Sequence, residues 1–307
     1  MRKLISCSLL SVFLLPAVIH TSSAAQEAAL ETRIDYGRRL ITTGTLNDTG
    51  PHDFIVDTAS TTTVIFENLA RTQTIKPSGR NDLSIFGLTG VQQLPTFVIG
   101  DLKFGPYEFP DLVAPILSDW RFFTRTPQGV LGLNFFNDKT VIFDIANDSL
   151  TFFEGPEAAA PILSDWRRAI LKRSTFALSD TPLLLAEMTI ARQKIPFIID
   201  TGSELTVVNL ATLERFPIVP RDALDNLPTD VSDVYGDSAP AFRVFLPRMK
   251  IGGVTWRNRA IYAADAPFFS EIGYDERPIG ILGLDFLKRQ RFAIDFANNK
   301  IYFEPEN

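Results

Sequence analysis

Two aspartates are the strongest candidates for acid–base chemistry, because each ends an apolar run in a nearly identical stretch of sequence. The first stretch is FIVDTAS at residues 54–60, and the second is FIIDTGS at residues 197–203. Other reactive side chains are scarce, since the chain has one cysteine, Cys7, and two histidines, His20 and His52. A cysteine nucleophile or a histidine-rich metal site is not expected. A Ser-His-Asp triad could use only His52, because His20 falls in the expected signal peptide at residues 1–25. Carboxylates are therefore the remaining candidates for acid–base chemistry.

The sequence around both aspartates repeats as well. A hairpin pattern leads into each of them, with strand-like residues at 40–46 in the first copy and at 183–189 in the second. Three later blocks recur in the same order: IGDLKF with IGGVTW, GVLGLNFF with GILGLDFL, and VIFDIANDSLTF with FAIDFANNKIYF. The offset is 143 residues at the aspartates and 151 or 152 at the later blocks. Four matching blocks indicate a duplicated domain in which each copy positions one aspartate.

Both copies are predicted to be mainly β, because short runs rich in Val, Ile, Phe and Thr alternate with Gly and Pro turns. We expect an N-terminal lobe at residues 26–155 and a C-terminal lobe at residues 176–307. Residues 156–175 are expected to form a helical linker, since apolar residues recur there at helical spacing. The octapeptide APILSDWR occurs at 114–121 and again at 160–167, and both copies are expected to form short helical turns.

The N-terminus has the pattern of a secretory signal peptide over residues 1–25. Two basic residues precede an apolar run from Leu9 to Ile19, and a small-residue cleavage site ends at Ala25. The apolar run is shorter than the ~20 residues of a membrane-spanning helix, so cleavage is favoured over a retained anchor. We therefore expect an exported protein, periplasmic or secreted, without stable membrane insertion. Cleavage would leave 28 basic against 36 acidic residues, which argues against a nucleic-acid partner.

The two Asp-Thr-small-Ser stretches, together with the Gly-apolar-apolar-Gly stretches at 129–132 and 280–283, resemble the aspartic protease superfamily. The resemblance is greater to its retropepsin-like branch than to pepsin itself, and it covers nearly the whole chain after the signal. It implies a mainly β fold of two retropepsin-like or pepsin-like β-barrel lobes with the active site between them. Retropepsins reach two lobes by pairing two chains. This chain carries both halves, so a monomer is expected.

The resemblance also implies an aspartic endopeptidase whose catalytic residues are Asp57 and Asp200. Two carboxylates held ~3 Å apart cannot both ionise, so they share one proton and present an acid and a base together. Such a pair can activate water and hydrolyse a peptide bond without a metal or any other cofactor. We expect the glycine-ending apolar strand to pass beneath each aspartate loop, where a Cβ would crowd it.

Four neighbouring side chains are expected to support this pair. By resemblance, the hydroxyls of Thr58 and Thr201 would hydrogen-bond to the opposite lobe and brace the two loops. The hydroxyls of Ser60 and Ser203 would donate to the outer carboxylate oxygens and favour the ionised form.

One supporting position departs from the family pattern, because Ala59 stands where the second copy has Gly202. A Cβ at a position that needs positive φ or a close approach would cost about 1 kcal/mol and could tilt Asp57. This leaves a second function open, a peptide-binding or regulatory protein that has lost turnover. A third is a structural exported β protein whose repeat reflects ancestry alone.

Access to the site is expected to be governed by a hairpin flap in each lobe. In the first lobe the flap would present Ile85, Phe86 and Gly87, and in the second Tyr235 and Gly236. The expected partner is a peptide or unfolded protein, bound in extended form by main-chain pairing with the flap edges.

Overall fold

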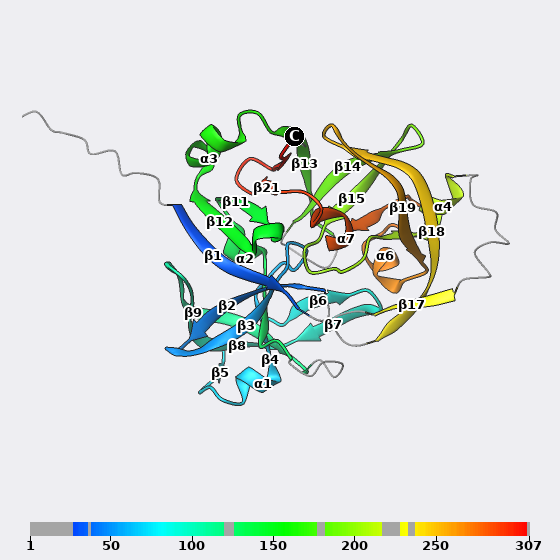
Figure 1. The fold of residues 1–307 in the computed structure, drawn as a ribbon. Coiled ribbons are helices and arrows are strands. Elements are labelled where there is room, and N and C mark those ends of the chain that lie inside the picture. The colour runs from blue at the N-terminus through cyan, green and yellow to red at the C-terminus, as the bar shows by residue number, and fades with distance from the viewer. Residues whose placement is uncertain are drawn as a thin grey trace, which may run out of the picture.

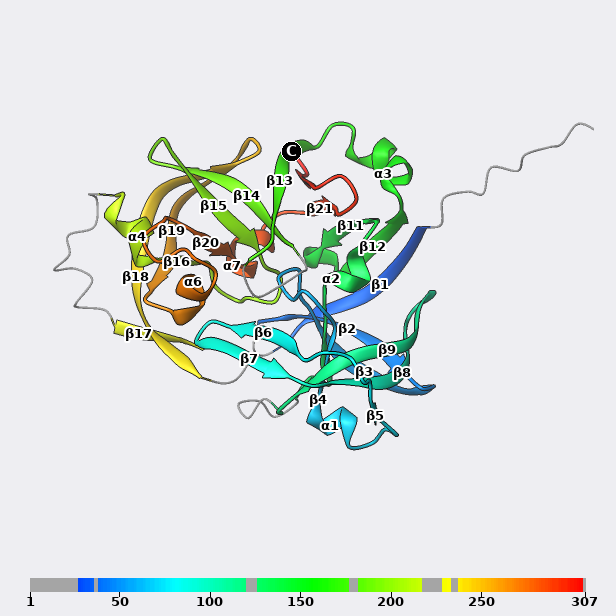
Figure 2. The same cartoon turned by 180° about the vertical axis from the view of Figure 1, so that it is seen from behind.

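The computed structural model describes residues 27–35, 38–119, 126–176, 182–216, 228–232 and 237–305. The expected signal peptide lies outside this part of the chain. Strands dominate the described residues, and they form two lobes joined by a shared sheet (Figure 1, and from behind in Figure 2). The prediction of a mainly β, two-lobed fold is confirmed.

The N-terminal lobe is a closed ring of six strands, in which each strand hydrogen-bonds to the next and the last returns to the first. Two of the six neighbour pairs are parallel, and the other four are antiparallel. Aromatic side chains fill the interior of this barrel. The Phe54 ring is edge-on to the Phe104 ring with centroids 5.1 Å apart, and the Phe104 ring is edge-on to the Phe135 ring with centroids 5.3 Å apart. In ring order the strands are β2 (Leu40–Leu46), β3 (Thr49–Val56), β10 (Gly129–Leu131), β4 (Val64–Phe66), β9 (Tyr107–Leu117) and β8 (Thr96–Phe104).

The C-terminal lobe repeats this ring strand for strand, including the positions of its two parallel pairs. The matching order confirms that the chain contains one barrel twice. The blocks IGDLKF and IGGVTW are not equivalent, because residues 99–104 lie within β8 whereas residues 251–256 span the turn between β18 and β19. In ring order the strands are β14 (Leu183–Ile190), β15 (Gln193–Ile199), β20 (Gly280–Leu282), β16 (Val207–Asn209), β19 (Val254–Ala264) and β18 (Ser238–Ile251).

A six-stranded antiparallel sheet joins the lobes. Three of its strands come from the N-terminal lobe, two from the C-terminal lobe and one from the linker between them. Its central seam pairs β11 with β21, so backbone hydrogen bonds cross directly from one lobe to the other. At this seam the rings of Phe143 and Phe292 stack with centroids 4.6 Å apart. In sheet order the strands are β1 (Glu27–Ile34), β12 (Ser149–Glu154), β11 (Lys139–Asp144), β21 (Phe292–Asp295), β22 (Lys300–Phe303) and β13 (Arg167–Ser174).

The linker between the lobes is helical only over its first half. Helix α3 (Pro156–Leu163) ends where expected helical spacing would continue, and residues 167–174 form β13 instead. The first half of β13 pairs with β22 and its second half with β14, so its backbone groups gain partners in both the shared sheet and the barrel. Ile170, one of the apolar residues at helical spacing in this segment, lies on β13 and is 75% exposed.

The two APILSDWR copies differ from each other in structure. Residues 114–117 end strand β9, whereas residues 160–163 end helix α3 and 167 begins β13. The expectation of two helical turns is therefore correct for one copy only, and Trp120 lies outside the described residues.

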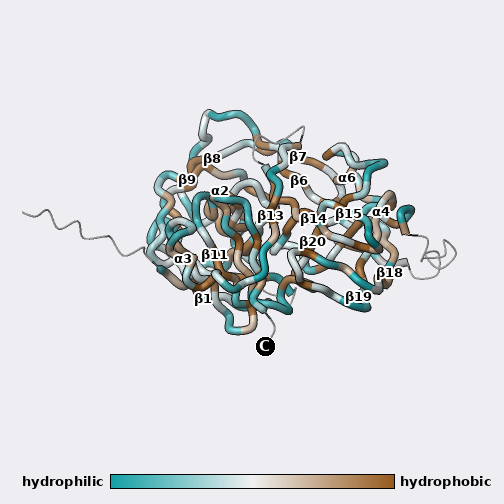
Figure 3. The backbone as a smooth tube through the Cα atoms, turned by 90° about the horizontal axis from the view of Figure 1, so that it is seen from above, coloured by the Kyte–Doolittle hydropathy of each residue, from teal (hydrophilic) through white to brown (hydrophobic). Residues whose placement is uncertain are grey.

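Short elements complete the lobes. The hairpin of β6 (Leu83–Gly87) and β7 (Gly90–Leu94) forms its own two-stranded sheet and reaches from the N-terminal lobe toward α6 (Pro267–Glu271), as the view from above shows (Figure 3). Strand β17 (Pro228–Ser232) pairs with the start of β18. The remaining elements are α1 (Glu67–Ala70), β5 (Lys76–Pro77), α2 (Leu133–Phe136), the 3₁₀ helix η1 (Ile145–Asn147), α4 (Leu210–Glu214) and α7 (Leu284–Leu287).

Candidate active site

The fold places the two aspartates at equivalent points of the two barrels. Asp57 follows β3 and Asp200 follows β15, each at the end of a parallel strand pair. The N–H of Asp57 donates to the carbonyl of Leu131 at 3.0 Å, and the N–H of Asp200 donates to that of Leu282 at 3.1 Å. These bonds fix each loop to the end of the apolar strand beside it.

Glycine is required where that apolar strand passes beneath the loop. A Cβ added to Gly132 would meet the carbonyl oxygen of Thr62 most closely and that of Ser60 at 2.9 Å, and one added to Gly283 would meet the carbonyl oxygen of Leu205 at 2.5 Å. Carbon atoms do not approach backbone oxygens this closely without displacing them. The predicted reason for both glycines is thereby confirmed.

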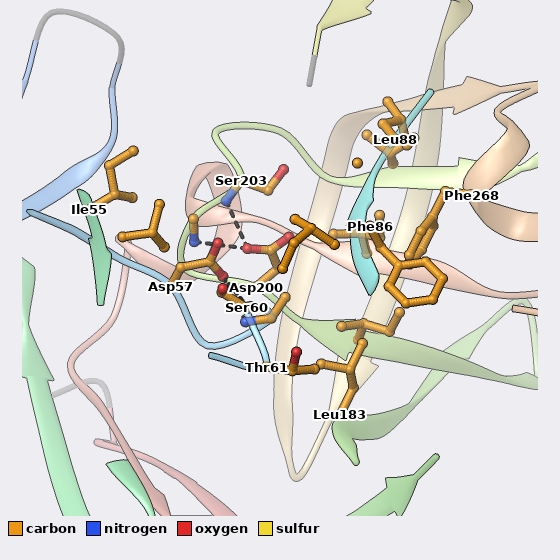
Figure 4. A pocket seen from close by; sticks show the side chains of 18 of the residues that line it. Ile55, Asp57, Ser60, Thr61, Phe86, Leu88, Leu183, Asp200, Ser203 and Phe268 are labelled. Carbon is orange, nitrogen blue, oxygen red and sulfur yellow. Dashed lines mark hydrogen bonds between the residues drawn. The ribbon is translucent and has the colours of Figure 1, made fainter. Parts of the chain in front are cut away.

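The two carboxyl groups converge at the centre of the molecule and lie within hydrogen-bonding reach of each other (Figure 4). Oδ1 of Asp57 accepts the N–H groups of Ala59 at 2.7 Å and Ser60 at 2.9 Å. Oδ1 of Asp200 accepts those of Gly202 at 2.8 Å and Ser203 at 2.9 Å. Each loop thus holds its carboxylate by the same two backbone donors.

The surroundings favour protonation of the pair. Burial raises the pKa of Asp57, although its two backbone donors and its bond with Asp200 act in the opposite direction. Burial, with the negative charge of Asp57 adding to it, holds the pKa of Asp200 well above its usual range. Desolvation penalises a charged carboxylate, and a second carboxylate beside it penalises charge further. One proton shared by two carboxylates is the state that this geometry supports.

The two threonines brace the loops across the lobes, as expected. The hydroxyl of Thr58 donates to the carbonyl of Ile199 and that of Thr201 donates to Val56, both at 2.8 Å. Each threonine hydroxyl also accepts the backbone N–H of the other threonine at 3.1 Å. Both side chains are fully buried.

The two serines act differently from the expectation. Their backbone N–H groups, and not their hydroxyls, bond the aspartates. The Ser60 hydroxyl donates to the carbonyl of Thr62 at 2.7 Å, and the Ser203 hydroxyl donates to that of Leu205 at 2.8 Å. A hydroxyl has a single proton to donate, and here a carbonyl two residues further on receives it. These serines therefore shape the loop.

The carboxyl groups open into a cavity of about 470 Å³ between the lobes. Most of its wall is apolar and comes in matched pairs from the two barrels, such as Ile55 with Ile198 and Val64 with Val207. Ala59 and Gly202 both line it. A cavity with apolar walls and a few polar groups at its floor is typical of a substrate site.

The first predicted flap lies over this cavity. Ile85, Phe86 and Gly87 line it as expected, and pairing of Gly87 with Gly90 closes the β6–β7 hairpin by a two-residue turn. The turn also docks on the other lobe, a contact that the sequence did not predict. The carbonyl of Leu88 accepts the N–H of Phe268 in α6 at 3.2 Å, and the Phe86 ring meets the Phe268 ring edge-on at 6.4 Å.

For the second flap, Tyr235 and Gly236 lie outside the described residues. The strands that flank them, β17 and β18, are present, and Asp230, Val231 and Ser232 of β17 line the cavity.

Charged groups missed by the sequence interpretation form one side of the cavity. Arg39 is only 3% exposed, and its Nε donates to the Asp35 carboxylate at 3.0 Å. Beside it, Arg38 crosses to the other lobe and donates to Glu204 at 3.1 Å. The signal available in sequence was weak, because paired arginines are ordinarily solvated surface residues.

Within the described ranges, no helix is long and apolar enough to cross a membrane. In the same ranges, no three His, Cys, Asp or Glu side chains come together as a possible metal site.

Comparison with known proteins agrees with this geometry. The family model described as aspartyl protease matches residues 42–135 and 186–286, one segment in each lobe. Among solved structures, the aspartic proteinase from Irpex lacteus superposes with a TM-score of 0.56 at 11% sequence identity. That match covers 92% of this chain and 98% of the other, and it establishes a shared fold. No curated protein matched the chain.

Proposed function

Because this chain belongs to the aspartyl protease family, we propose that it is an exported aspartic endopeptidase that uses Asp57 and Asp200 to activate water. The observation that carries the proposal is the pair of buried carboxyl groups, one from each lobe, within hydrogen-bonding reach of each other. One ionised and one protonated carboxyl group can remove a proton from water and give a proton to the scissile carbonyl oxygen.

The substrate is proposed to be an extended peptide or an unfolded protein. An extended backbone can pair with the strands of the β6–β7 hairpin, while its side chains enter the apolar cavity. Since both lobes belong to one chain and a closed pair of barrels frames the site, a monomer is sufficient for activity.

The test is cleavage of one unfolded protein and one synthetic peptide by the wild type, Asp57→Asn and Asp200→Asn across a range of pH. Either substitution is expected to reduce kcat/KM by at least ~10²-fold, because it removes the acid–base step. The wild type should give a bell-shaped pH profile. A peptide with a hydroxyl in place of the scissile carbonyl should inhibit, since it resembles the tetrahedral intermediate. Full activity of Asp57→Asn would contradict the proposal.

Ala59 supports a second candidate, a peptide-binding protein without turnover, because it replaces the smaller residue found at the matching position of the other lobe. Peptide affinity without cleavage, in a wild type that gains turnover on Ala59→Gly substitution, would favour this candidate.

A further inference from the structure

The two aspartate loops are matched bond for bond except at one position that faces the carboxyl groups. In both loops the aspartate Oδ1 accepts the N–H groups of the residues two and three positions later. The first of those residues is Ala59 in one loop and Gly202 in the other. One methyl group therefore distinguishes otherwise equivalent carboxylate environments.

The place of that methyl follows from the geometry at Gly202. A Cβ built on Gly202 would lie within 2.9 Å of all three heavy atoms of the Asp57 carboxyl group. The loops are related by an approximate two-fold axis, since Thr58 and Thr201 exchange equal N–H to hydroxyl bonds of 3.1 Å. By the same relation Ala59 belongs beside the Asp200 carboxyl group. Since a real methyl cannot approach a carboxyl group as closely as the Cβ built on Gly202, the spacing between loop and carboxyl group must differ between the two lobes.

We propose that Ala59 is a positioning residue that decides which of the two carboxyl groups carries the shared proton. Its methyl shields the Asp200 carboxyl from water, so Asp200 holds the proton and Asp57 is the ionised base. Ala59 packs against the apolar core and also lines the cavity, so its methyl lies where water would otherwise reach the carboxyl group. Asp57 faces the bare Cα of Gly202. Both aspartates accept the same two backbone donors, so the methyl is the difference between their surroundings.

Burial raises the pKa of both aspartates, so the pair as a whole retains a proton. Among the described residues, three other charged groups line the cavity: Arg39, which is bonded to Asp35; Glu204, which is bonded to Arg38; and the exposed Asp230. None of these three is a cause of the pKa shift of either aspartate.

The roles in the reaction follow. Asp57 takes a proton from water as the water oxygen bonds to the scissile carbon, and Asp200 gives its proton to the carbonyl oxygen. When the carbon–nitrogen bond breaks, Asp57 gives its proton to the leaving nitrogen, and one hydroxyl of the intermediate returns a proton to Asp200. This assignment of roles rests on the proposed function, but the location of the proton can be measured without turnover.

The experiment is a pH titration of ¹³C-labelled aspartate carboxyl groups by NMR in the wild type, in Ala59→Gly and in the exchange variant Ala59→Gly with Gly202→Ala. Asp57→Asn and Asp200→Asn spectra assign the two signals. In the wild type, between the two titration steps of the pair, the Asp200 signal should be that of a carboxylic acid and the Asp57 signal that of a carboxylate. In Ala59→Gly the Asp57 and Asp200 signals should become alike, because neither carboxyl group is then shielded by a methyl. In the exchange variant Asp57 should give the signal of a carboxylic acid and Asp200 that of a carboxylate.

A second readout is the pH profile of kcat/KM. Ala59→Gly should move the alkaline limb to lower pH and leave the acid limb in place, because only the group that loses its shielding methyl titrates more easily.

The proposal is overturned if Asp57 carries the proton in the wild type, or if Ala59→Gly changes neither the carboxyl signals nor the profile. The exchange variant adds a methyl in a close contact and can fail to fold, but Ala59→Gly removes atoms and decides the question alone. If no variant cleaves any peptide, the proposed function fails while the NMR result still stands.

Discussion

Thr58 and Thr201 each accept the backbone N–H of the other at 3.1 Å, and each donates its hydroxyl to the strand before the opposite aspartate. Four hydrogen bonds between fully buried groups therefore tie the two aspartate loops together at the interface of the lobes. A buried polar group without a hydrogen-bond partner lowers the stability of the fold. Every donor and acceptor in these four bonds has a partner, so the connection between the loops is strong.

Replacing Thr58 by Val keeps the shape but removes the hydroxyl. The carbonyl of Ile199 and the N–H of Thr201 would lose their partners, at a cost of about 1–3 kcal/mol for each group left unpaired. Urea denaturation should show this loss, and Thr201→Val should show a similar one because its bonds are equivalent. Thr43→Val, at an exposed position of β2, is the control and should be close to neutral. A loss of the same size in the control would show that the bracing is not the cause.

Asp200→Asn is expected to stabilise the fold at neutral pH while it abolishes activity. A raised native pKa means that the folded protein keeps a proton that the unfolded chain has already released. Stability therefore falls as pH rises from about 4, the value in the unfolded chain, up through the native pKa. Asn carries no charge, so the substitution removes this loss of folding free energy. The loss is about 1.4 kcal/mol for each unit by which the native pKa is raised. Denaturation at pH 4 and pH 7 measures it, with Asp230→Asn on the exposed face of β17 as the charge control. Equal gains at both pH values would contradict the explanation.

Asp285 offers a comparison inside the chain, because the matching residue of the first lobe is Asn134. Burial raises the pKa of Asp285, and its Oδ1 accepts the Thr206 hydroxyl at 2.7 Å. The Asn134 amide oxygen accepts the Thr63 hydroxyl and N–H, both at 2.8 Å. Asp285→Asn should thus raise stability above the native pKa and leave it unchanged below pH 4. The reverse substitution, Asn134→Asp, should destabilise at neutral pH, and thermal melts at both pH values would reveal any failure of this symmetry.

Phe268→Ala should release the β6–β7 hairpin from the C-terminal lobe. The substitution removes the ring contact with Phe86, and the remaining bond to the Leu88 carbonyl is a single one. Amide hydrogen exchange in residues 84–92 should become at least several-fold faster, since local opening follows the number of contacts that hold a segment. Phe245→Ala on β18, whose side chain is 58% exposed, is the matched control. Unchanged exchange would mean that the hairpin is held by its own strands.

The sequence was sufficient for the barrels and the aspartate pair because the same blocks occur twice in one order. The strands β2, β3 and β10 therefore had counterparts in β14, β15 and β20 that supported their assignment. Contacts between segments remote in sequence had no such signal, which is why the docking of Leu88 on Phe268 was not predicted. For Ser60 and Ser203 the difficulty was chemical: a hydroxyl close to both a carboxylate and a carbonyl can donate to either, and only loop geometry decides.

APILSDWR shows the same limit directly. One copy ends a strand that pairs with β4 and β8, and the other ends helix α3 before β13 enters the shared sheet. Identical residues thus take different backbone conformations, because the neighbouring strands determine which hydrogen bonds are available. Helical spacing in 156–175 had the same ambiguity, and pairing with β22 prevailed over helix propensity from Arg167 onward.

The seam between β11 and β21 has a consequence for how the chain could be divided. Cutting the chain after Leu163 would give two halves. In one half the edge of β11 that faces β21 would be uncovered, and in the other half the edge of β21 that faces β11. An uncovered strand edge is a row of unpaired donors and acceptors that readily recruits another strand. Because the two edges are complementary in register and carry the stacked Phe143 and Phe292 rings, separately produced halves should reassemble by fragment complementation. Each half alone would have to cover its edge with a second copy of itself.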